Sequence, residues 1–149
     1  MILQIDAGNT RIKWRVLDGS EAVLQGDQLT ASVLAGQPLA LLGVTGVSLA
    51  QLSSVASETV VISLSKQVEA EFGIALHVAK VSGQVGAVSC GYSDPETLGV
   101  DRWMAVLGVF QKTGRASVVV DAGSAVTVDV VSEDGMHQGG YIVPGIRLL

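Results

Sequence analysis

One pattern occurs twice in this sequence, and it limits the folds that the chain can adopt. In each copy an apolar strand ends in Asp-Ala-Gly, a small polar residue follows, and a second apolar strand comes before Asp-Gly. The copies occupy residues 1–19 and 117–135, so that Asp121 of the second follows Asp6 of the first by 115 residues. A tight turn between two apolar strands indicates a β-hairpin, and its repetition indicates a duplicated structural unit.

The turn of the first copy has the composition of a phosphate-binding site. Gly8 and Asn9 tolerate positive φ, so we expect a tight turn whose backbone N–H groups point outward. Such a row of donors suits a phosphate, Asp6 beside it suits a divalent cation, and Lys13 supplies a positive charge on the second strand. Asp-x-Gly turns also occur in ordinary hairpins, and this alternative stays open.

Two such hairpins placed around a nucleotide are typical of actin-like and sugar-kinase-like ATPases. We therefore predict an α/β chain with the actin-like ATPase (ribonuclease H-like) fold and duplicated β-hairpin motifs. Residues 1–115 are expected to form the first domain, and residues 116–149 the beginning of a second domain.

Between the two copies, the hydrophobic pattern predicts a β-α-β unit. Its helix covers residues 58–72, with Ser57 as the cap and Gly73 as the stop signal. Ser53 and Ser54 before it either line a site or turn the chain. The remaining expected elements are an edge strand over 22–29, a weak helix over 31–42 capped by Ser32, and strands over 47–55 and 74–81.

The segment after this unit combines a long loop with a helix start of unusual charge. Residues 82–98 form the loop, and a helix with Trp103 in its buried stripe runs to residue 112, before Gly114. Asp101 in the first turn complements the helix dipole, whereas Arg102 opposes it. Arg102 therefore indicates another stabilising partner, such as an anionic ligand.

Composition and charge exclude several classes of function. The formal net charge is −5, the pI is about 4.8, and no basic cluster occurs, so nucleic acid and anionic membranes are not expected as partners. A single cysteine excludes an internal disulfide and fits a reducing compartment. Residues 28–57 are uncharged, but glycines, a proline and serines interrupt them, so we expect no spanning helix, no secretion signal and a cytoplasmic protein.

Four spaced motifs resemble those of one family, the type III pantothenate kinases. This resemblance covers the chain from Met1 onward and implies phosphorylation of pantothenate by ATP, the first step of coenzyme A synthesis. The motifs are Asp6-x-Gly-Asn-Thr-x-x-Lys13, Gly91-Tyr92 with 98–103, Asp121-x-Gly-Ser-Ala125 with Thr127 and Asp129, and 139–145.

The resemblance also implies a role for individual residues. Asp101 would be the general base, Asp121 would bind a monovalent cation (potassium or ammonium), and Asp6 would hold magnesium through the phosphates. Pantothenate would be bound by Tyr92, Gly99, Val100, Asp101 and Arg102. ATP would be bound by Asp6, Ala7, Gly8, Asn9, Thr10, Arg11, Ile12, Lys13 and Ser124. The family further implies a homodimer, and the small charged fraction of 15% agrees with a surface covered by a second subunit.

The chain departs from the family pattern in two residues and in length. Ser124 replaces the usual Thr and keeps its hydroxyl, and Cys90 stands where Asn is common. Family members also continue well beyond residue 149. The alternatives are a catalytically silent accessory or regulatory relative, and a kinase of the same superfamily with another small-molecule substrate. Retention of all five residues Asp6, Lys13, Asp101, Arg102 and Asp121 favours the pantothenate kinase.

Overall fold

The structure is a computed structural model that describes residues 1–41 and 43–145. The chain divides into two compact units, Met1–Ala79 and Lys80–Leu149. This division falls earlier in the chain than the domain boundary that the repeat predicts after residue 115. That boundary rests on the duplication of the hairpin and stays a prediction.

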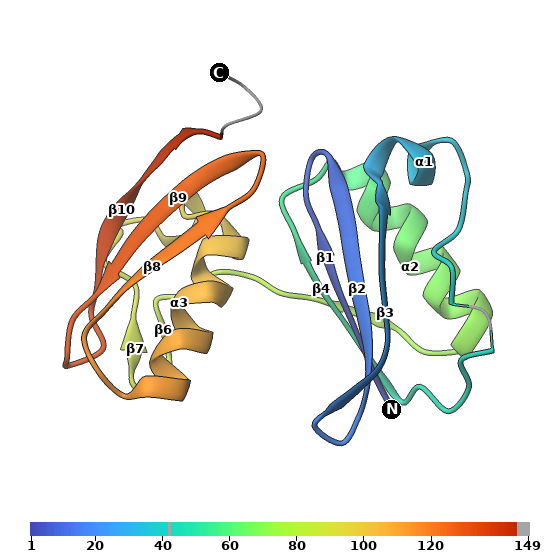
Figure 1. The fold of residues 1–149 in the computed structure, drawn as a ribbon, viewed down its shortest axis with the longest axis horizontal. Helices are drawn as coiled ribbons and strands as arrows, with labels where there is room; N and C mark the ends of the chain where they lie inside the picture. The colour runs from blue at the N-terminus through green and yellow to red at the C-terminus, as the bar shows by residue number, and fades with distance from the viewer. Residues whose placement is uncertain (42, 146–149) are drawn as a thin grey trace. The chain divides into compact units, whose positions relative to one another are not determined.

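Unit 1, Met1–Ala79, is a five-stranded sheet with helices on one face (Figure 1). The strand order is β3-β2-β1-β4-β5, in which β1, β2 and β3 are antiparallel and β4 and β5 run parallel to β1. This is the predicted β-α-β unit attached to a hairpin and an edge strand. The elements are β1 (Ile2–Ala7), β2 (Arg11–Asp18), β3 (Glu21–Leu29), α1 (Thr30–Leu34), β4 (Leu49–Ser54), α2 (Glu58–Phe72) and β5 (Leu76–Val78).

The core of unit 1 lies between the sheet and its two helices. Alternate residues of β1 and β2 point to this side, as period-2 strands require, and α2 contributes one apolar stripe. The fully or almost fully buried members of this cluster include Leu3, Ile5, Ile12, Trp14, Val60, Leu64 and Val68. The other face of β1 and β2 carries polar side chains, which positions Asp6 and Lys13 away from the core.

Unit 2, Lys80–Leu149, is a three-stranded antiparallel sheet with one long helix and a short β-ribbon (Figure 1). The strand order is β10-β9-β8, and α3 packs on β8 and β9. Trp103 and Val106 of α3 are buried against Val119 and Val131 of the sheet. The elements are β6 (Gln84–Val85), β7 (Val88–Ser89), the 3₁₀ turn η1 (Pro95–Thr97), α3 (Val100–Thr113), β8 (Ser117–Ala122), β9 (Ala125–Val131) and β10 (His137–Pro144).

Several predicted elements need correction. The weak helix over 31–42 is wrong beyond Leu34, and Ser32 does not cap it, because Leu29 occupies the N-cap position; residue 42 lies outside the described residues. Ser57 does occupy the N-cap position of α2, but its side chain makes no capping hydrogen bond. The loop over 82–98 contains the β6–β7 ribbon and η1.

Other local predictions are confirmed. Gly73 and Gly114 end α2 and α3 in the left-handed conformation, with φ of 67° and 59°. Glycine adopts this conformation without the steric cost that a Cβ atom adds. The edge position of β3 and the parallel pairing of β5 are as predicted. In the part of the chain that the structure describes, no helix is both long and apolar enough to cross a membrane.

Candidate active site

The first hairpin turn joins β1 to β2 through Gly8, Asn9 and Thr10. Gly8 N–H donates to the Arg11 carbonyl at 2.9 Å, and a Cβ atom on Gly8 would lie 3.1 Å from that carbonyl oxygen. Among the described residues, neither Gly8 nor Asn9 has positive φ, so the backbone conformation suggested by the sequence is wrong. The close approach of the Arg11 carbonyl explains the glycine instead.

Thr30, the first residue of α1, holds this turn, and no sequence pattern predicted this role. The Thr30 hydroxyl donates to the Gly8 carbonyl at 2.8 Å, and its backbone N–H donates to the Thr10 carbonyl at 3.0 Å. Thr30 is buried, so these bonds are shielded from water. The hairpin turn is thereby fixed at both of its ends.

Asp6, Lys13 and Ser53 lie in one row across the polar face of the sheet. Strand register places Asp6 directly opposite Lys13 on β2 and Ser53 on β4. Asp6 and Lys13 are exposed, while the Ser53 hydroxyl is buried and has no hydrogen-bond partner within the described residues. A carboxylate, an ammonium group and a hydroxyl thus lie on neighbouring strands, which is a suitable arrangement for phosphate and a cation.

The other residues predicted to bind ATP differ in what they can offer. Ala7 and Ile12 are fully buried in the core, so only their backbone groups are available to a ligand. Arg11 forms an ion pair with Asp27 on β3, in which Nε donates to Oδ2 at 2.6 Å. Arg11 therefore already has an anionic partner on the neighbouring strand.

The second hairpin turn joins β8 to β9 through Gly123 and Ser124. Asp121 is exposed and lies opposite Thr127 in the register. The Ser124 carbonyl accepts a hydrogen bond from Gly145 N–H at 3.2 Å, and a Cβ on Gly145 would lie 2.5 Å from that oxygen. Gly145 thus allows the end of β10 to approach the turn that carries Ser124.

The start of α3 brings four of the residues predicted to bind the substrate onto one turn, Gly99, Val100, Asp101 and Arg102. Gly99 is the N-cap residue, and a Cβ on it would lie 2.6 Å from Asp101 Oδ1. Asp101 is half-buried, and its Oδ1 accepts from Arg102 N–H at 2.8 Å. A carboxylate in the first turn is stabilised by the helix dipole, which accounts for this geometry without a ligand.

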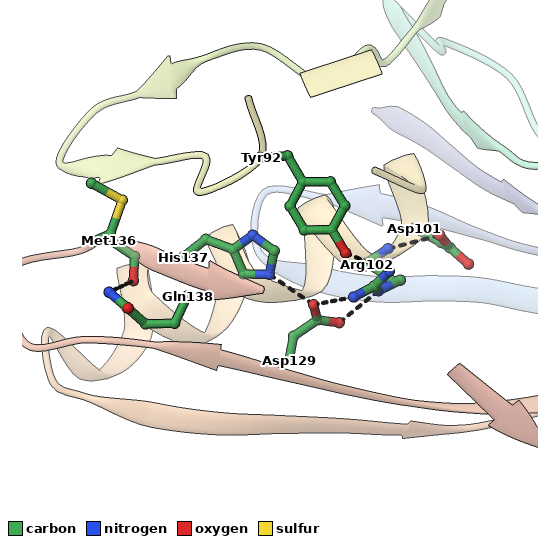
Figure 2. A network of polar contacts seen from close by, with 7 residues as sticks. All are labelled: Tyr92, Asp101, Arg102, Asp129, Met136, His137 and Gln138. Atoms are coloured by element: carbon green, nitrogen blue, oxygen red, sulfur yellow. Dashed lines mark hydrogen bonds and ion pairs between the residues drawn. The ribbon is translucent and has the colours of Figure 1, made fainter. Parts of the chain in front are cut away.

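Arg102 has an anionic partner inside the chain, and this partner is Asp129 of β9 (Figure 2). Arg102 Nε lies 2.9 Å from Asp129 Oδ2, and Nη2 lies 2.7 Å from Oδ1, so the pair is bidentate. The two side chains are only 6% and 2% exposed. The ion pair with Asp129 therefore explains why a basic residue occupies the first helical turn. From the sequence alone, an anionic ligand was the suggested partner of Arg102.

Two aromatic side chains complete the polar network around this pair. The His137 ring lies with Nε2 2.7 Å from Asp129 Oδ1, and because a carboxylate only accepts, Nε2 is the donor. Tyr92 stacks on His137 with ring centroids 5.6 Å apart, and its hydroxyl accepts from Arg102 Nη1 at 3.4 Å. Tyr92 and Arg102, both predicted to bind the substrate, are thus in contact.

The ionisation of the pair follows from its contacts. Burial raises the pKa of Asp129, but hydrogen bonds from Arg102 and His137 outweigh burial and lower the pKa overall. The hydrogen bond with Asp129 is the main reason that the pKa of Arg102 is raised. The guanidinium group therefore stays a fixed cation at the start of α3.

The candidate residues form separate groups in the two units. Unit 1 holds residues 6–13, and unit 2 holds the second hairpin and the network of Tyr92, Asp101 and Arg102. The contacts of Asp129 and His137 with this network were not predicted from the sequence. Among the described residues, no group of three or more His, Cys, Asp or Glu side chains forms a metal centre.

Comparison with solved structures gives the fold. The fold is similar to that of a protein from Campylobacter jejuni described as a conserved Baf family transcriptional activator, with a TM-score of 0.57, 23% identity, and coverage of 97% of this chain and 55% of the other. It is also similar to a protein from Sinorhizobium meliloti described as a 2-dehydro-3-deoxygalactonokinase, with a TM-score of 0.55, 7% identity, and coverage of 95% and 54%. The chain has the predicted actin-like ATPase fold.

Sequence comparison then gives the family. The model of the type III pantothenate kinase family matches residues 2–149, and the chain belongs to this family. It is 43% identical over 155 residues to a type III pantothenate kinase of Ectopseudomonas mendocina (strain ymp), and the match covers 100% of this chain and 60% of the relative. The chain spans about 60% of the length of the curated relatives that it matches first.

Proposed function

We propose that this chain carries the ATP phosphate hairpin and the pantothenate-binding helix of a type III pantothenate kinase. The reaction is the phosphorylation of pantothenate by ATP to 4'-phosphopantothenate, the first step of coenzyme A synthesis. The observation that carries the proposal is that Arg102, at the start of α3, contacts both Asp101 and Tyr92. Its backbone N–H donates to Asp101 Oδ1 at 2.8 Å, and its Nη1 donates to the Tyr92 hydroxyl at 3.4 Å. This is the set of residues that the family resemblance assigns to the acceptor substrate.

The acceptor carboxylate is assigned to Arg102, with Tyr92, Gly99 and Val100 beside it. A guanidinium group has five N–H donors, and the bidentate pair with Asp129 uses those of Nε and Nη2. Nη1 takes no part in the pair with Asp129 and donates to the Tyr92 hydroxyl. A carboxylate at this edge would accept from both side chains.

Asp101 is assigned as the general base. Its carboxylate would accept the proton of the pantothenate hydroxyl as the hydroxyl oxygen forms a bond to the γ-phosphorus of ATP. The bond from that phosphorus to the β–γ bridging oxygen breaks, and ADP leaves. Because the transition state of phosphoryl transfer is loose, the proton leaves late and the carboxylate does not need a raised pKa.

The hairpin of unit 1, residues 6–13, is assigned to ATP, and in unit 2 Ser124 of the second hairpin turn is also assigned to ATP. Magnesium commonly takes one or two carboxylates together with substrate phosphates, so the single carboxylate Asp6 fits it. Bound magnesium neutralises charge on the phosphates. Lys13, opposite Asp6, adds a point charge. Asp121, exposed at the equivalent strand end, is assigned to a monovalent cation, potassium or ammonium.

The proposal extends to assembly and location. The family implies a homodimer, and the absence of a basic cluster in a chain of net charge −5 agrees with partners other than nucleic acid. Both substrates are small soluble metabolites, which fits a cytoplasmic enzyme.

Two residues depart from the family pattern. Ser124 keeps the hydroxyl of the family's Thr. The backbone N–H of Cys90 donates to the Gly83 carbonyl at 2.9 Å.

The test is a coupled assay of ADP release with ATP, magnesium and pantothenate, with and without potassium or ammonium. It is run on the 149-residue chain and on a chimera in which this chain replaces the matching part of the Ectopseudomonas mendocina relative. Turnover should depend on pantothenate and on the monovalent cation. Asp101→Asn should lower kcat by about 10²- to 10⁴-fold, because it removes the proton acceptor.

Glu96→Gln is the matched control, since Glu96 is an exposed carboxylate in the segment just before α3. Its turnover should equal that of the unsubstituted protein. Pantothenate-independent ADP release, or full activity of Asp101→Asn, would contradict the proposal. A chimera that folds and binds pantothenate without turning it over would favour a silent relative.

A further inference from the structure

The contacts of Arg102, Asp129, His137 and Tyr92 form a closed circuit. Arg102 bonds to Asp129, Asp129 to His137, His137 stacks on Tyr92, and the Tyr92 hydroxyl accepts from Arg102 (Figure 2). The four residues come from α3, β9, β10 and the segment that precedes η1. Two of them, Asp129 and His137, have no role in the reaction proposed above.

Stability alone is a weak reason for the charged pair in this circuit. Desolvation of two buried charges cancels much of their attraction, and apolar residues of similar volume commonly serve a core at least as well. A bidentate guanidinium–carboxylate pair does fix the plane of the guanidinium group. The position of Arg102 Nη1 is therefore fixed as well, and it lies 3.4 Å from the hydroxyl oxygen of Tyr92.

His137 acts on the carboxylate. It is fully buried, and within the described residues its Nδ1 has no hydrogen-bond partner. Its one polar contact there is thus Nε2 to Asp129 Oδ1 at 2.7 Å, and this oxygen also accepts from Arg102 Nη2. The two donors fix the orientation of the Asp129 carboxylate. The face of the His137 ring stacks on the ring of Tyr92.

Two glycines leave the space that this circuit occupies. A Cβ on Gly140 would lie 2.5 Å from Asp129 Oδ1 and 2.7 Å from Arg102 Nη2, and also 2.1 Å from the Val128 carbonyl. Gly91 comes immediately before Tyr92 in the chain, and a Cβ on Gly91 would lie 1.8 Å from the His137 carbonyl oxygen. Any side chain at either position would displace a member of the circuit or its backbone.

We propose that Asp129, His137 and Gly140 are positioning residues that set the specificity for a carboxylate-bearing acceptor, by fixing Arg102 Nη1 and the Tyr92 hydroxyl as a pair of donors. The proposal rests on the proposed function, because it assigns the acceptor carboxylate to Arg102. It assigns no chemistry to the three residues themselves. Their effect is on the binding of the acceptor and not on the transfer step.

The test compares pantothenate with its alcohol analogue, in which CH₂OH replaces the carboxylate, as substrates of the chimera described above. Asp129→Asn keeps the shape of the side chain but puts an amide where donors of Arg102 and His137 converge. We expect its KM for pantothenate to rise about tenfold or more, with kcat within about threefold and the KM for the alcohol and for ATP nearly unchanged.

A pair of variants at His137 guards against loss of folding in Asp129→Asn. His137→Leu removes the donor, while His137→Gln retains an N–H that can reach Asp129. We expect the leucine variant to reproduce the rise in KM for pantothenate and the glutamine variant to restore much of the affinity. Gln138→Ala, at the exposed neighbour on β10, is the matched control and should leave both substrates unaffected.

An independent measurement uses the 149-residue chain without substrate. NMR of the Arg102 Nε–H reports whether the guanidinium is held, since a buried bidentate pair slows its exchange with water. We expect this protection to be lost in Asp129→Asn and reduced in His137→Leu.

The two proposals fail in different ways. An unchanged ratio of pantothenate to alcohol efficiency in Asp129→Asn, with turnover intact, would overturn the positioning role. A chimera that turns over neither substrate would contradict the proposed function instead. In that case, an Arg102 Nε–H that exchanges equally fast in all variants would overturn the positioning role as well.

Discussion

The hairpins β1–β2 and β8–β9 share one alternation of side chains and bury opposite faces. Strand register pairs Leu3 with Val16 in the first and Val118 with Val130 in the second. Leu3 is 0% exposed, whereas Val118, at the corresponding position, is 65% exposed. The next pair on this face behaves in the same way, with 3% exposure at Ile5 and 60% at Val120.

The helices explain the difference. In unit 1, α1 and α2 follow the hairpin in the chain and cover the face of Leu3. In unit 2, α3 precedes the hairpin and covers the other face, which carries Val119, Asp129 and Val131. An inward-facing Asp is stable there because α3 supplies Arg102. The pattern of a strand therefore does not decide its buried face when both faces hold apolar residues.

The largest expected effect is on the inward-facing Asp, which has no counterpart in unit 1. Asp129→Ala would leave Arg102 as an uncompensated buried charge, and such losses cost about 3–5 kcal/mol. The free energy of unfolding of unit 2 is followed by the fluorescence of Trp103 in a Trp14→Phe background, because the chain has 2 tryptophans, one in each core. A cost below about 1 kcal/mol would mean that the pair is hydrated in solution.

The second effect tests the two apolar faces directly. Leu3→Ala removes a fully buried side chain and should lower the free energy of unfolding of unit 1 by about 3 kcal/mol. Val118→Ala, at the matching position, should change that of unit 2 by no more than about 0.5 kcal/mol in the 149-residue chain. Denaturant titrations of single-tryptophan variants give both values. Equal costs would show that the Val118 face is covered in solution.

The third effect is a dependence on pH that unit 2 has through Asp129. The pKa of Asp129 is lower in the folded state than its ordinary value of 3.8, so its contribution is present above that pH and is lost as the pH falls through the folded-state pKa. Acid titration monitored by Trp103 should show this loss, and Asp129→Asn should lack it. Asp134→Asn is the control, because Asp134 is a second carboxylate of unit 2 whose pKa is lowered, here by the hydrogen bond from Ser132. This variant should keep the loss of stability that comes from Asp129.

The smallest effect is expected for the exposed ion pair of unit 1. Arg11 and Asp27 are 46% and 44% exposed, so water and salt screen their attraction. Asp27→Ala should lower the stability of unit 1 by at most about 1 kcal/mol, and the difference should shrink further in 1 M salt. A cost similar to that of Asp129→Ala would contradict the contrast between exposed and buried pairs.

Local signals in the sequence predicted most of the fold. The alternation of β1 and β2, the helix over 58–72 and the glycines that end α2 and α3 depend on neighbouring residues only. The weak helix over 31–42 failed because tertiary contacts decide this segment. Gln67 of α2 bonds both the N–H and the carbonyl of Leu39, at 2.9 and 3.1 Å, and so replaces the bonds that a helix would supply.

The candidate site was predictable only where a motif is contiguous. Residues 6–13 and 99–102 carry their own turn and helix-start chemistry. Asp129 lies 27 residues from Arg102 and 8 from His137, so no local pattern joins them. The available signal was a single carboxylate within the valine-rich strand over 125–131, which is a costly place for a charge without a partner.

The two hairpin turns differ by one residue, with three residues between β1 and β2 and two between β8 and β9. This difference determines how the halves of the chain must be aligned with each other. At the constant spacing of 115 residues set by Asp6 and Asp121, Trp14 falls on Asp129, although the register pairs Ile5 with Trp14 and Val120 with Val128. An ungapped alignment of the halves would therefore match residues that have different cross-strand partners along the whole second strand, and one gap in the turn restores the correspondence between the pairs.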